Sequence, residues 1–310
     1  MASIIELSSV TKRFRGRPAL SDVSLSIPAG IIGLLGPNGS GKSTMIKILL
    51  GLVRPSSGKA SVLGMSLPRQ IRSIRDRVGY MPEDDCFVAG LSGIESIQMM
   101  ARLSGLPGRE GLRRAHEILD FSEIGQERYR MVETYSTGMR QKLKFAQALV
   151  HDPALLILDE PTTGLDPEQR IAMLRRIKHL AEQHGKSVML STHILHDVRE
   201  VCRSVVILAK GTVRVVDTLE RLSRPQRAGL QVGLFGDASA FGRSLKARGV
   251  ESETQSPDSL WVYGVDESNT RVLWQAAEEA SVLISQVTTG ANSLEDIFFR
   301  AVTESHHAAP

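Results

Sequence analysis

The stretch of sequence that decides the fold is Gly36-Pro37-Asn38-Gly39-Ser40-Gly41-Lys42-Ser43-Thr44. It fits the pattern G-x-x-x-x-G-K-[ST], with an apolar run, Ile31–Leu35, before it and a helical pattern after it. Glycines let the backbone turn tightly, so that several N–H groups point at one anion, and a helix start adds positive potential. The stretch predicts a strand-to-helix loop that holds the phosphates of a nucleotide; the alternative is a glycine-rich turn without a ligand.

The side chains of this loop have separate expected roles. Lys42 is long enough to reach the β- and γ-phosphates, the Ser43 hydroxyl can hold Mg²⁺, and Thr44 can add a further phosphate contact. The remaining residues expected to surround the phosphates are Gly36, Asn38, Gly39, Ser40 and Gly41. The loop therefore predicts ATP and Mg²⁺ as ligands.

A second chemical signal lies at residues 155–160, where Leu-Leu-Ile-Leu is followed directly by Asp159 and Glu160. An unpaired buried charge is costly, so two adjacent carboxylates at the end of an apolar strand need a reason. Side chains alternate along a strand, and the two carboxylates therefore point different ways. Beside a nucleotide, Asp159 is expected to face the metal, and Glu160 the attacking water as general base or water-orienting group. Two solvated acids are the alternative.

Short apolar runs alternate with helical patterns from residue 4 to about residue 217. Several runs show no polar alternation, which is typical of strands covered on both faces. The predicted strands are 31–35, 78–81, 155–158, 187–191 and 205–209, and the predicted helices between them are 42–52, 167–184 and 194–202. We expect an α/β fold: a P-loop core with a mainly parallel sheet, an antiparallel β subdomain containing 4–10 and 23–27, and a helical insertion over about 92–150.

The last part of the chain is predicted to form a second domain after a first domain over 1–218. The segment 219–229 contains Pro225 and has the composition of a linker. Patterns for three strands and three helices predict a small C-terminal α+β domain over 230–304, with a frayed tail over 305–310. Residues 237–310 carry 5 Lys/Arg and 11 Asp/Glu, a net charge of 5 − 11 = −6, which leaves 4 + 6 = +10 for residues 1–236. Such an asymmetry fits two domains.

Composition excludes several classes of protein. Among 310 residues, 42% are hydrophobic and 23% charged, which excludes a mostly disordered chain. The two cysteines, Cys86 and Cys202, are too few for a disulfide framework and lack zinc-ligand spacing. No run of 18 apolar residues and no signal-peptide pattern is present, so we expect a chain that does not span a bilayer.

Five separated motifs resemble one known family. In order, they are the loop 36–44, Tyr135-Ser136-Thr137-Gly138-Met139-Arg140-Gln141, the segment 155–161, Gly164-Leu165-Asp166 and Ser191-Thr192-His193. Over about residues 4–217 the chain resembles the ATP-binding subunits of ABC transporters. The chain is most similar to the ATPase subunits of drug-exporter-like two-component systems. This likeness lies in the sequence of the second motif, in the segment YMPE and in the appended small domain.

The resemblance implies a head-to-tail dimer with two ATP molecules at its interface. Each ATP would lie between the loop of one copy and the second motif of the other, where Ser136 and Gly138 would touch the γ-phosphate. Ser136 also suits a helix N-cap, and the two roles can coexist. Asp166 would lie in a loop that crosses the interface, and His193 would contact the γ-phosphate bound by its own copy.

Two more roles come from the resemblance. Phe14 stands where these subunits have an aromatic residue that stacks on adenine; a core Phe at the end of the first strand is the alternative. Glu83 stands where many members have a Gln that senses metal and nucleotide and faces the membrane partner. Its oxygen still permits metal coordination, but it adds a charge. Thr137 and Met139 also depart from the family pattern.

The motifs and the resemblance predict an ATP-hydrolysing subunit that forms a homodimer and drives a separate transmembrane permease, with export as the implied direction. The predicted catalytic residues are Lys42, Glu160 and His193, and the predicted metal ligands are Ser43, Asp159 and Glu83. Such a subunit would be cytoplasmic and peripheral, held at the inner face of the cell membrane by the permease. The rival interpretation is a soluble ABC-class ATPase acting on nucleic acid or ribosomes. Only the basic first domain favours it, and no nucleic-acid partner is expected.

Overall fold

The structure is a computed structural model that describes residues 3–223, 229–265, 269–289 and 293–303. The chain divides into two compact units, one formed by residues up to 219 together with those from 298, the other by residues 220–297. Each unit has its own hydrophobic core. The segment expected to be a linker begins with a short helix, α8 (Leu219–Ser223), and the division between the units falls inside α11 (Leu294–Thr303).

A six-stranded sheet with the order β10-β9-β3-β8-β7-β6 forms the centre of the first unit. Its strands are β3 (Ile31–Leu35), β6 (Val78–Met81), β7 (Leu155–Asp159), β8 (Ser187–Ser191), β9 (Ser204–Ala209) and β10 (Thr212–Thr218). All neighbours are parallel except β9 and β10. Every residue of β3, β7 and β8 is buried, as expected of unbroken apolar runs. The predicted α/β core is confirmed, and β10 is an addition to it.

An antiparallel sheet with the order β2-β1-β4-β5 packs with the first helix of the core. Its strands are β1 (Ser3–Phe14), β2 (Arg17–Pro28), β4 (Ser57–Val62) and β5 (Met65–Leu67). Apolar side chains from this sheet, from the central sheet and from α1 (Lys42–Leu49) form one core cluster. Both flanks of α1 are therefore packed, and the loop before it is held between two sheets.

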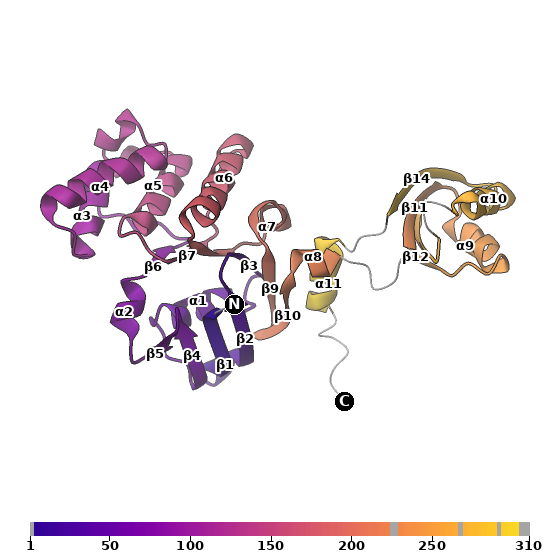
Figure 1. Cartoon of the computed structure of the whole chain (residues 1–310), viewed down its shortest axis with the longest axis horizontal. Coiled ribbons are helices and arrows are strands. Elements are labelled where there is room, and N and C mark those ends of the chain that lie inside the picture. Colours follow the sequence, from indigo (N-terminus) through magenta and orange to yellow (C-terminus); the bar gives the residue numbers. More distant parts are fainter. Residues whose placement is uncertain (1–2, 224–228, 266–268, 290–292, 304–310) are drawn as a thin grey trace. The chain divides into compact units, whose positions relative to one another are not determined.

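Three helices form a separate group in the first unit: α3 (Gly93–Leu103), α4 (Gly108–Phe121) and α5 (Thr137–Leu149). Figure 1 shows them together, away from the antiparallel sheet. This group corresponds to the predicted helical insertion. The remaining helices of the first unit are α2 (Ile71–Arg75), α6 (Pro167–His184) and α7 (Leu195–Val201), with two short 3₁₀ turns at Gln126–Tyr129 and Val132–Thr134. Within the described ranges, no helix is long and apolar enough to cross a membrane.

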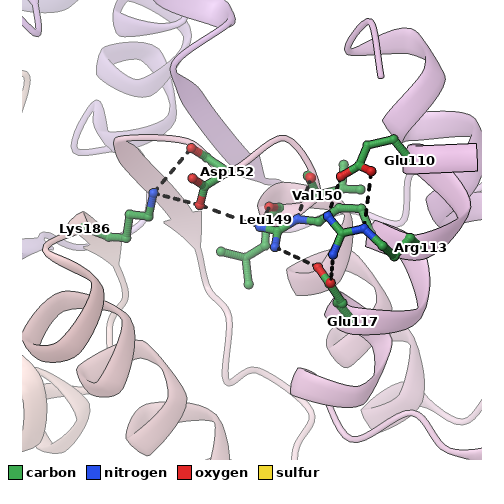
Figure 2. A network of polar contacts seen from close by, with 8 residues as sticks. Glu110, Arg113, Glu117, Leu149, Val150, Asp152 and Lys186 are labelled. Atoms are coloured by element: carbon green, nitrogen blue, oxygen red, sulfur yellow. Dashed lines mark hydrogen bonds and ion pairs between the residues drawn. The ribbon is translucent and has the colours of Figure 1, made fainter. Parts of the chain in front are cut away.

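The carboxyl end of α5 is held by the polar network in Figure 2. Arg114 of α4 donates to the carbonyl oxygens of Val150 at 3.1 Å and Leu149 at 3.5 Å. The last carbonyl groups of a helix have no partner within the helix, so these hydrogen bonds satisfy them. Asp152 Oδ1 lies 3.6 Å from Arg114 Nη2 and 2.8 Å from Nζ of Lys186, the residue before β8. The Lys186 ammonium holds the pKa of Asp152 below its usual value. The end of α5 is thereby tied both to α4 and to the central sheet.

The second unit has the element order βαββαβ. Its elements are β11 (Gly229–Phe235), α9 (Ala238–Ala247), β12 (Ser252–Ser256), β13 (Ser259–Tyr263), α10 (Arg271–Ala280) and β14 (Leu283–Thr289). The strand order is β12-β13-β11-β14, and all neighbours are antiparallel. This is the ferredoxin-like arrangement of two split βαβ units. The two helices lie together on the sheet (Figure 1), and both contribute to the core of this unit. The predicted small α+β fold is confirmed.

Replacing Asp152 by Asn tests the anchor of α5. The φ angle of residue 152 is +55°, which Asn tolerates, so the change removes mainly the charge. A lowered native pKa means that the stabilisation is fully present above the unfolded-state pKa and disappears as the pH falls through the native value. We expect urea unfolding to show a loss of about 0.5–1 kcal/mol near neutral pH, the scale of an exposed ion pair.

The pH series decides this interpretation. The difference between Asp152→Asn and the wild-type protein should persist down to roughly the ordinary carboxyl pKa and shrink only below it. A difference independent of pH, or none at neutral pH, would contradict the anchor.

Candidate active site

The loop 36–41 connects the carboxyl end of β3 to α1. Gly41 is the N-cap of α1 with φ +109°, and a Cβ there would come within 2.8 Å of the Ala19 carbonyl oxygen. No side chain caps α1, which leaves its first N–H groups available to an anion. Lys42 is buried, and its Nζ donates to the Gly36 carbonyl oxygen at 2.7 Å. The loop thus presents backbone donors and one ammonium group in the same place.

A cavity of about 550 Å³ opens at this loop. It is lined by Ala19, Asn38, Gly39, Ser40, Gly41, Lys42, Ser43, Thr44, Glu83, Asp159, Glu160 and His193. All of these except Ala19 were predicted as site residues. The predicted residues come from four segments that are far apart in the sequence and that follow β3, β6, β7 and β8. The parallel sheet brings the carboxyl ends of these strands to one edge.

Three carboxylates, those of Glu83, Asp159 and Glu160, line the cavity. Asp159 is the last residue of β7, and Asp159 and Glu160 are nearly inaccessible, at 5% and 6% exposure. Glu160 has φ +50°, a conformation that costs a non-glycine residue about 1–3 kcal/mol and that clusters at functional sites. Burial raises the pKa of Asp159, and the charges of Glu83 and Glu160 raise it further. This concentration of negative charge suits a bound cation.

The Glu160 carboxylate is oriented by side chains from the segments that follow β7 and β8. His193 Nδ1 lies 3.0 Å from Oε1, and the hydroxyls of Thr163 and Thr192 donate to Oε2 at 3.3 and 3.4 Å. The Glu160 N–H donates to the Ser191 carbonyl oxygen at 2.8 Å. Glu160 and His193 are therefore held as a pair on the wall of the cavity, at the ends of β7 and β8.

Asp197, in the first turn of α7, supports this pair and was missed by sequence reasoning. It has 0% exposure and accepts hydrogen bonds from Thr162 Oγ1 at 2.5 Å and from Arg170 Nε at 2.6 Å. It thus joins α7 to the segment after Glu160 and to α6. The sequence carries no clear signal for this role, because an Asp in the first turn of a short helix is ordinarily solvated.

Two predicted residues, Gly36 and Phe14, do not line the cavity. Gly36 does not line the cavity; its carbonyl oxygen instead accepts from Lys42. Phe14 ends β1 and does not line the cavity either, but its ring is 46% exposed, so the alternative of a core Phe is wrong. Lys12 Nζ lies 4.8 Å from the centre of the ring. The ring remains accessible to a flat ligand.

Three further predicted residues form a different surface, where the helices α5 and α6 begin. Ser136 caps α5 by accepting from the Met139 N–H at 3.3 Å, and Asp166 caps α6 by accepting from the Gln169 N–H at 2.8 Å. The Gln169 side chain covers Gly138, where a Cβ would lie 2.2 Å from Oε1. Ser136, Gly138 and Asp166 therefore belong together, but they do not line the cavity of their own copy.

Comparisons with known proteins show the family of the chain. Residues 20–163 match the family described as ABC transporter. The uncharacterized ABC transporter ATP-binding protein YdbJ of Bacillus subtilis (strain 168) is 32% identical over 302 residues, which cover 97% of this chain and 96% of that protein. The Nod factor export ATP-binding protein I of Rhizobium meliloti (strain 1021) is 33% identical over 302 residues, which cover 96% of this chain and 87% of that protein.

A solved structure is also similar to this chain. The dimeric post-hydrolysis state of an ATP-binding cassette bound to ADP and Pi has a TM-score of 0.65 and 26% sequence identity, and the match covers 69% of this chain and 98% of that one. The fold and the loop define a P-loop ATPase. The chain belongs to the ABC transporter family, as an ATP-binding subunit. Subunits of this kind dimerise and work with transmembrane permeases.

Asp159→Asn is expected to stabilise the protein in the absence of nucleotide. A raised native pKa means that the ionised carboxylate costs stability near neutral pH, and the cost fades as the pH falls through the native value. We expect the free energy of unfolding to rise by on the order of 1 kcal/mol, the usual scale of single substitutions. Thermal unfolding at neutral and mildly acidic pH measures it.

The matched control is Asp76→Asn, which changes an exposed carboxylate outside the cavity. It should leave the melting temperature nearly unchanged. A lower melting temperature for Asp159→Asn at neutral pH would mean that this carboxylate is compensated within the protein itself.

Proposed function

We propose that this subunit hydrolyses Mg²⁺-ATP in the cavity at the loop 36–44, and that a dimer of it drives export through a separate transmembrane permease. One observation carries the proposal: the Glu160–His193 pair lines the same cavity as Lys42 and the free start of α1. A general base, a polar partner and a phosphate cradle in one cavity are what ATP hydrolysis needs.

Mg²⁺ would be held by Ser43, Asp159 and Glu83. Their hydroxyl and carboxylate oxygens are the ligands that this ion prefers, and the raised pKa of Asp159 marks a charge in need of compensation. Within the part of the chain that the structure describes, no three His, Cys, Asp or Glu side chains form a metal site by themselves. This fits an ion that shares its ligands with the phosphates, whose charge it neutralises when bound.

The residues of the cavity have different roles in hydrolysis. The oxygen of a water attacks the γ-phosphorus, the bond from that phosphorus to the bridging oxygen breaks, and ADP leaves with the bonding electron pair. Glu160 takes the proton of the water, and His193 holds the carboxylate and faces the γ-phosphate. Lys42 and the first N–H groups of α1 stabilise the charge on the transferred group.

The surface around Ser136, Gly138 and Asp166 would complete the cavity of a second copy. In support, these residues lie together outside the cavity of their own copy, at the starts of α5 and α6, which Ser136 and Asp166 cap. A γ-phosphate bound by both copies would hold the dimer closed. Cleavage of this phosphate would remove the shared contact and let the dimer open, so the state of one bond would determine whether the closed or the open dimer is favoured. The Phe14 ring would stack on the adenine.

Export is favoured by the relative named as a Nod factor export protein, which aligns with 96% of this chain. The permease would hold the subunit at the inner face of the cell membrane. The rival interpretation, action on nucleic acid or ribosomes, gains no support, because these relatives carry the names of transporter or export proteins.

Glu160→Gln tests the proposed function directly. The amide keeps the size of the side chain but cannot take a proton, so we expect steady-state ATPase activity to fall by about 10²-fold or more while ATP still binds. With Mg²⁺-ATP, the variant should accumulate as a dimer in size-exclusion chromatography. Glu168→Gln, an exposed change on α6, should behave as wild type. Wild-type turnover in Glu160→Gln would exclude Glu160 as the general base.

Lys42→Ala is expected to abolish measurable ATP binding or turnover, because the ammonium that reaches the β- and γ-phosphates is lost. Lys47→Ala is the control, since Lys47 lies on the same helix with an exposed side chain. Titration with a fluorescent ATP analogue and a phosphate-release assay measure both steps. Unchanged affinity and rate in Lys42→Ala would overturn the assignment of the loop.

A further inference from the structure

The buried carboxylate of Asp197 holds the segment that follows Glu160. Thr162 Oγ1 donates to Asp197 Oδ2 at 2.5 Å, and residue 162 lies two positions after Glu160. The next residue, Thr163, donates from its hydroxyl to Glu160 Oε2 and from its N–H to the Glu160 carbonyl oxygen, both at 3.3 Å. Residues 160–163 therefore form a tight turn, and Asp197 holds the side of this turn that faces away from the Glu160 carboxylate.

The same residue holds the segment that carries His193, because Asp197 lies in the first turn of α7. The Asp197 N–H donates to the Ile194 carbonyl oxygen at 3.2 Å, and the Ile194 N–H donates to Thr192 Oγ1 at 3.1 Å. The Thr192 hydroxyl in turn donates to Glu160 Oε2 at 3.4 Å. The contacts therefore form a closed ring that starts and ends at Glu160, and His193 is one of the residues in it.

Neither member of the Glu160–His193 pair is fixed by its own surroundings alone. The side chain of His193 is 61% exposed, so packing does not hold the imidazole, and its place depends on the backbone that carries it. Glu160 has φ +50°, a strained conformation that persists only where the surrounding structure enforces it. Both residues thus depend on contacts between the two segments that follow β7 and β8. Asp197 is the buried side chain that joins these segments.

The charge of Asp197 is difficult to explain by stability alone. The residue is 0% exposed, and its Oδ1 lies 2.6 Å from Arg170 Nε. Among the described residues, Arg170 Nη2 is buried and has no hydrogen-bond partner. Such an ion pair contributes little net stability, because the cost of removing the charges from water offsets their attraction. Apolar side chains would fill the space without this cost, so the pair indicates a role in positioning.

We propose that Asp197 is a positioning residue for hydrolysis, whose carboxylate keeps the general base Glu160 oriented toward the cavity, 3.0 Å from His193. Asp197 does not itself line the cavity. The inference rests on the proposed function and adds to it a residue that acts through Glu160. The phosphate loop is not part of the ring of contacts, so loss of Asp197 lowers kcat and leaves ATP binding intact.

The test compares Asp197→Ala with Asp197→Asn in a phosphate-release assay. The alanine variant removes both acceptors and should lower kcat by about tenfold or more, while the Kd of a fluorescent ATP analogue stays within about twofold because the loop 36–44 is intact. In the asparagine variant, the amide can accept from Arg170 and donate to the Thr162 hydroxyl, so most of kcat should remain. Glu200→Ala, an exposed change on the same helix, is the control and should behave as wild type.

A double-mutant cycle separates positioning from a general loss of structure. Glu160→Gln lacks the general base, so a residue that acts through Glu160 has little further to remove in this background. Asp197→Ala should therefore change the single-turnover rate of Glu160→Gln by less than about threefold. An equal loss in both backgrounds would overturn the proposal. So would a wild-type kcat in Asp197→Ala, or a loss that Asp197→Asn does not largely restore.

If Asp197→Ala does not fold, Thr162→Val and Thr162→Ser decide alone. Valine has the shape of threonine without the hydroxyl that donates to Asp197, whereas serine keeps this hydroxyl. Thr162→Val should lower kcat several-fold at unchanged Kd, and Thr162→Ser should stay close to wild type. The same kcat in both variants would contradict the role of Asp197. Failure of the proposed function is distinct, because it would appear as wild-type turnover in Glu160→Gln.

Discussion

The structure depends on two carboxylates, Asp159 and Glu160, that are buried at the carboxyl end of a strand with no exposed residue. Charges in such a place are costly unless cations and hydrogen bonds compensate them. The chain supplies part of this compensation with Lys42 and His193 around one cavity. The strands β3, β7 and β8 are neighbours in the parallel sheet, so the polar segments that follow them meet at one edge.

Helix α5 contacts several separate parts of the first unit. Its carboxyl end is fixed to α4 and the central sheet through Arg114 and Asp152. In its middle, Lys144 donates to the carbonyl oxygens of Pro82 and Glu83 and so holds the segment that follows β6. Its start is capped by Ser136, which does not line the cavity of its own copy. The position of the helix is therefore set at both ends and in the middle.

Most of the central fold could be predicted because β3, β7 and β8 are unbroken apolar runs. β4 and β12 could not, since their sequences, SGKASV and SETQS, are polar and only pairing with neighbours makes them strands. The site residues, too, could be predicted only where the signal lies in neighbouring residues. Residues within contiguous motifs were found, whereas Lys144 and Asp197 were not. A charged residue in a helix is ordinarily exposed, and each of these two becomes buried only when distant segments meet.

The sequence by itself determined the phosphate loop, the carboxylate pair and the order along the chain of the apolar strands and the helices between them, because these depend on neighbouring residues and on local periodicity. Only the tertiary structure decided which segments share the cavity and that Glu160 contacts His193. It also decided that Phe14 is exposed and that the buried Lys144 donates hydrogen bonds to two carbonyl groups. Burial, pKa and contact depend on what surrounds a side chain in space, and those surroundings come from residues far away in the chain.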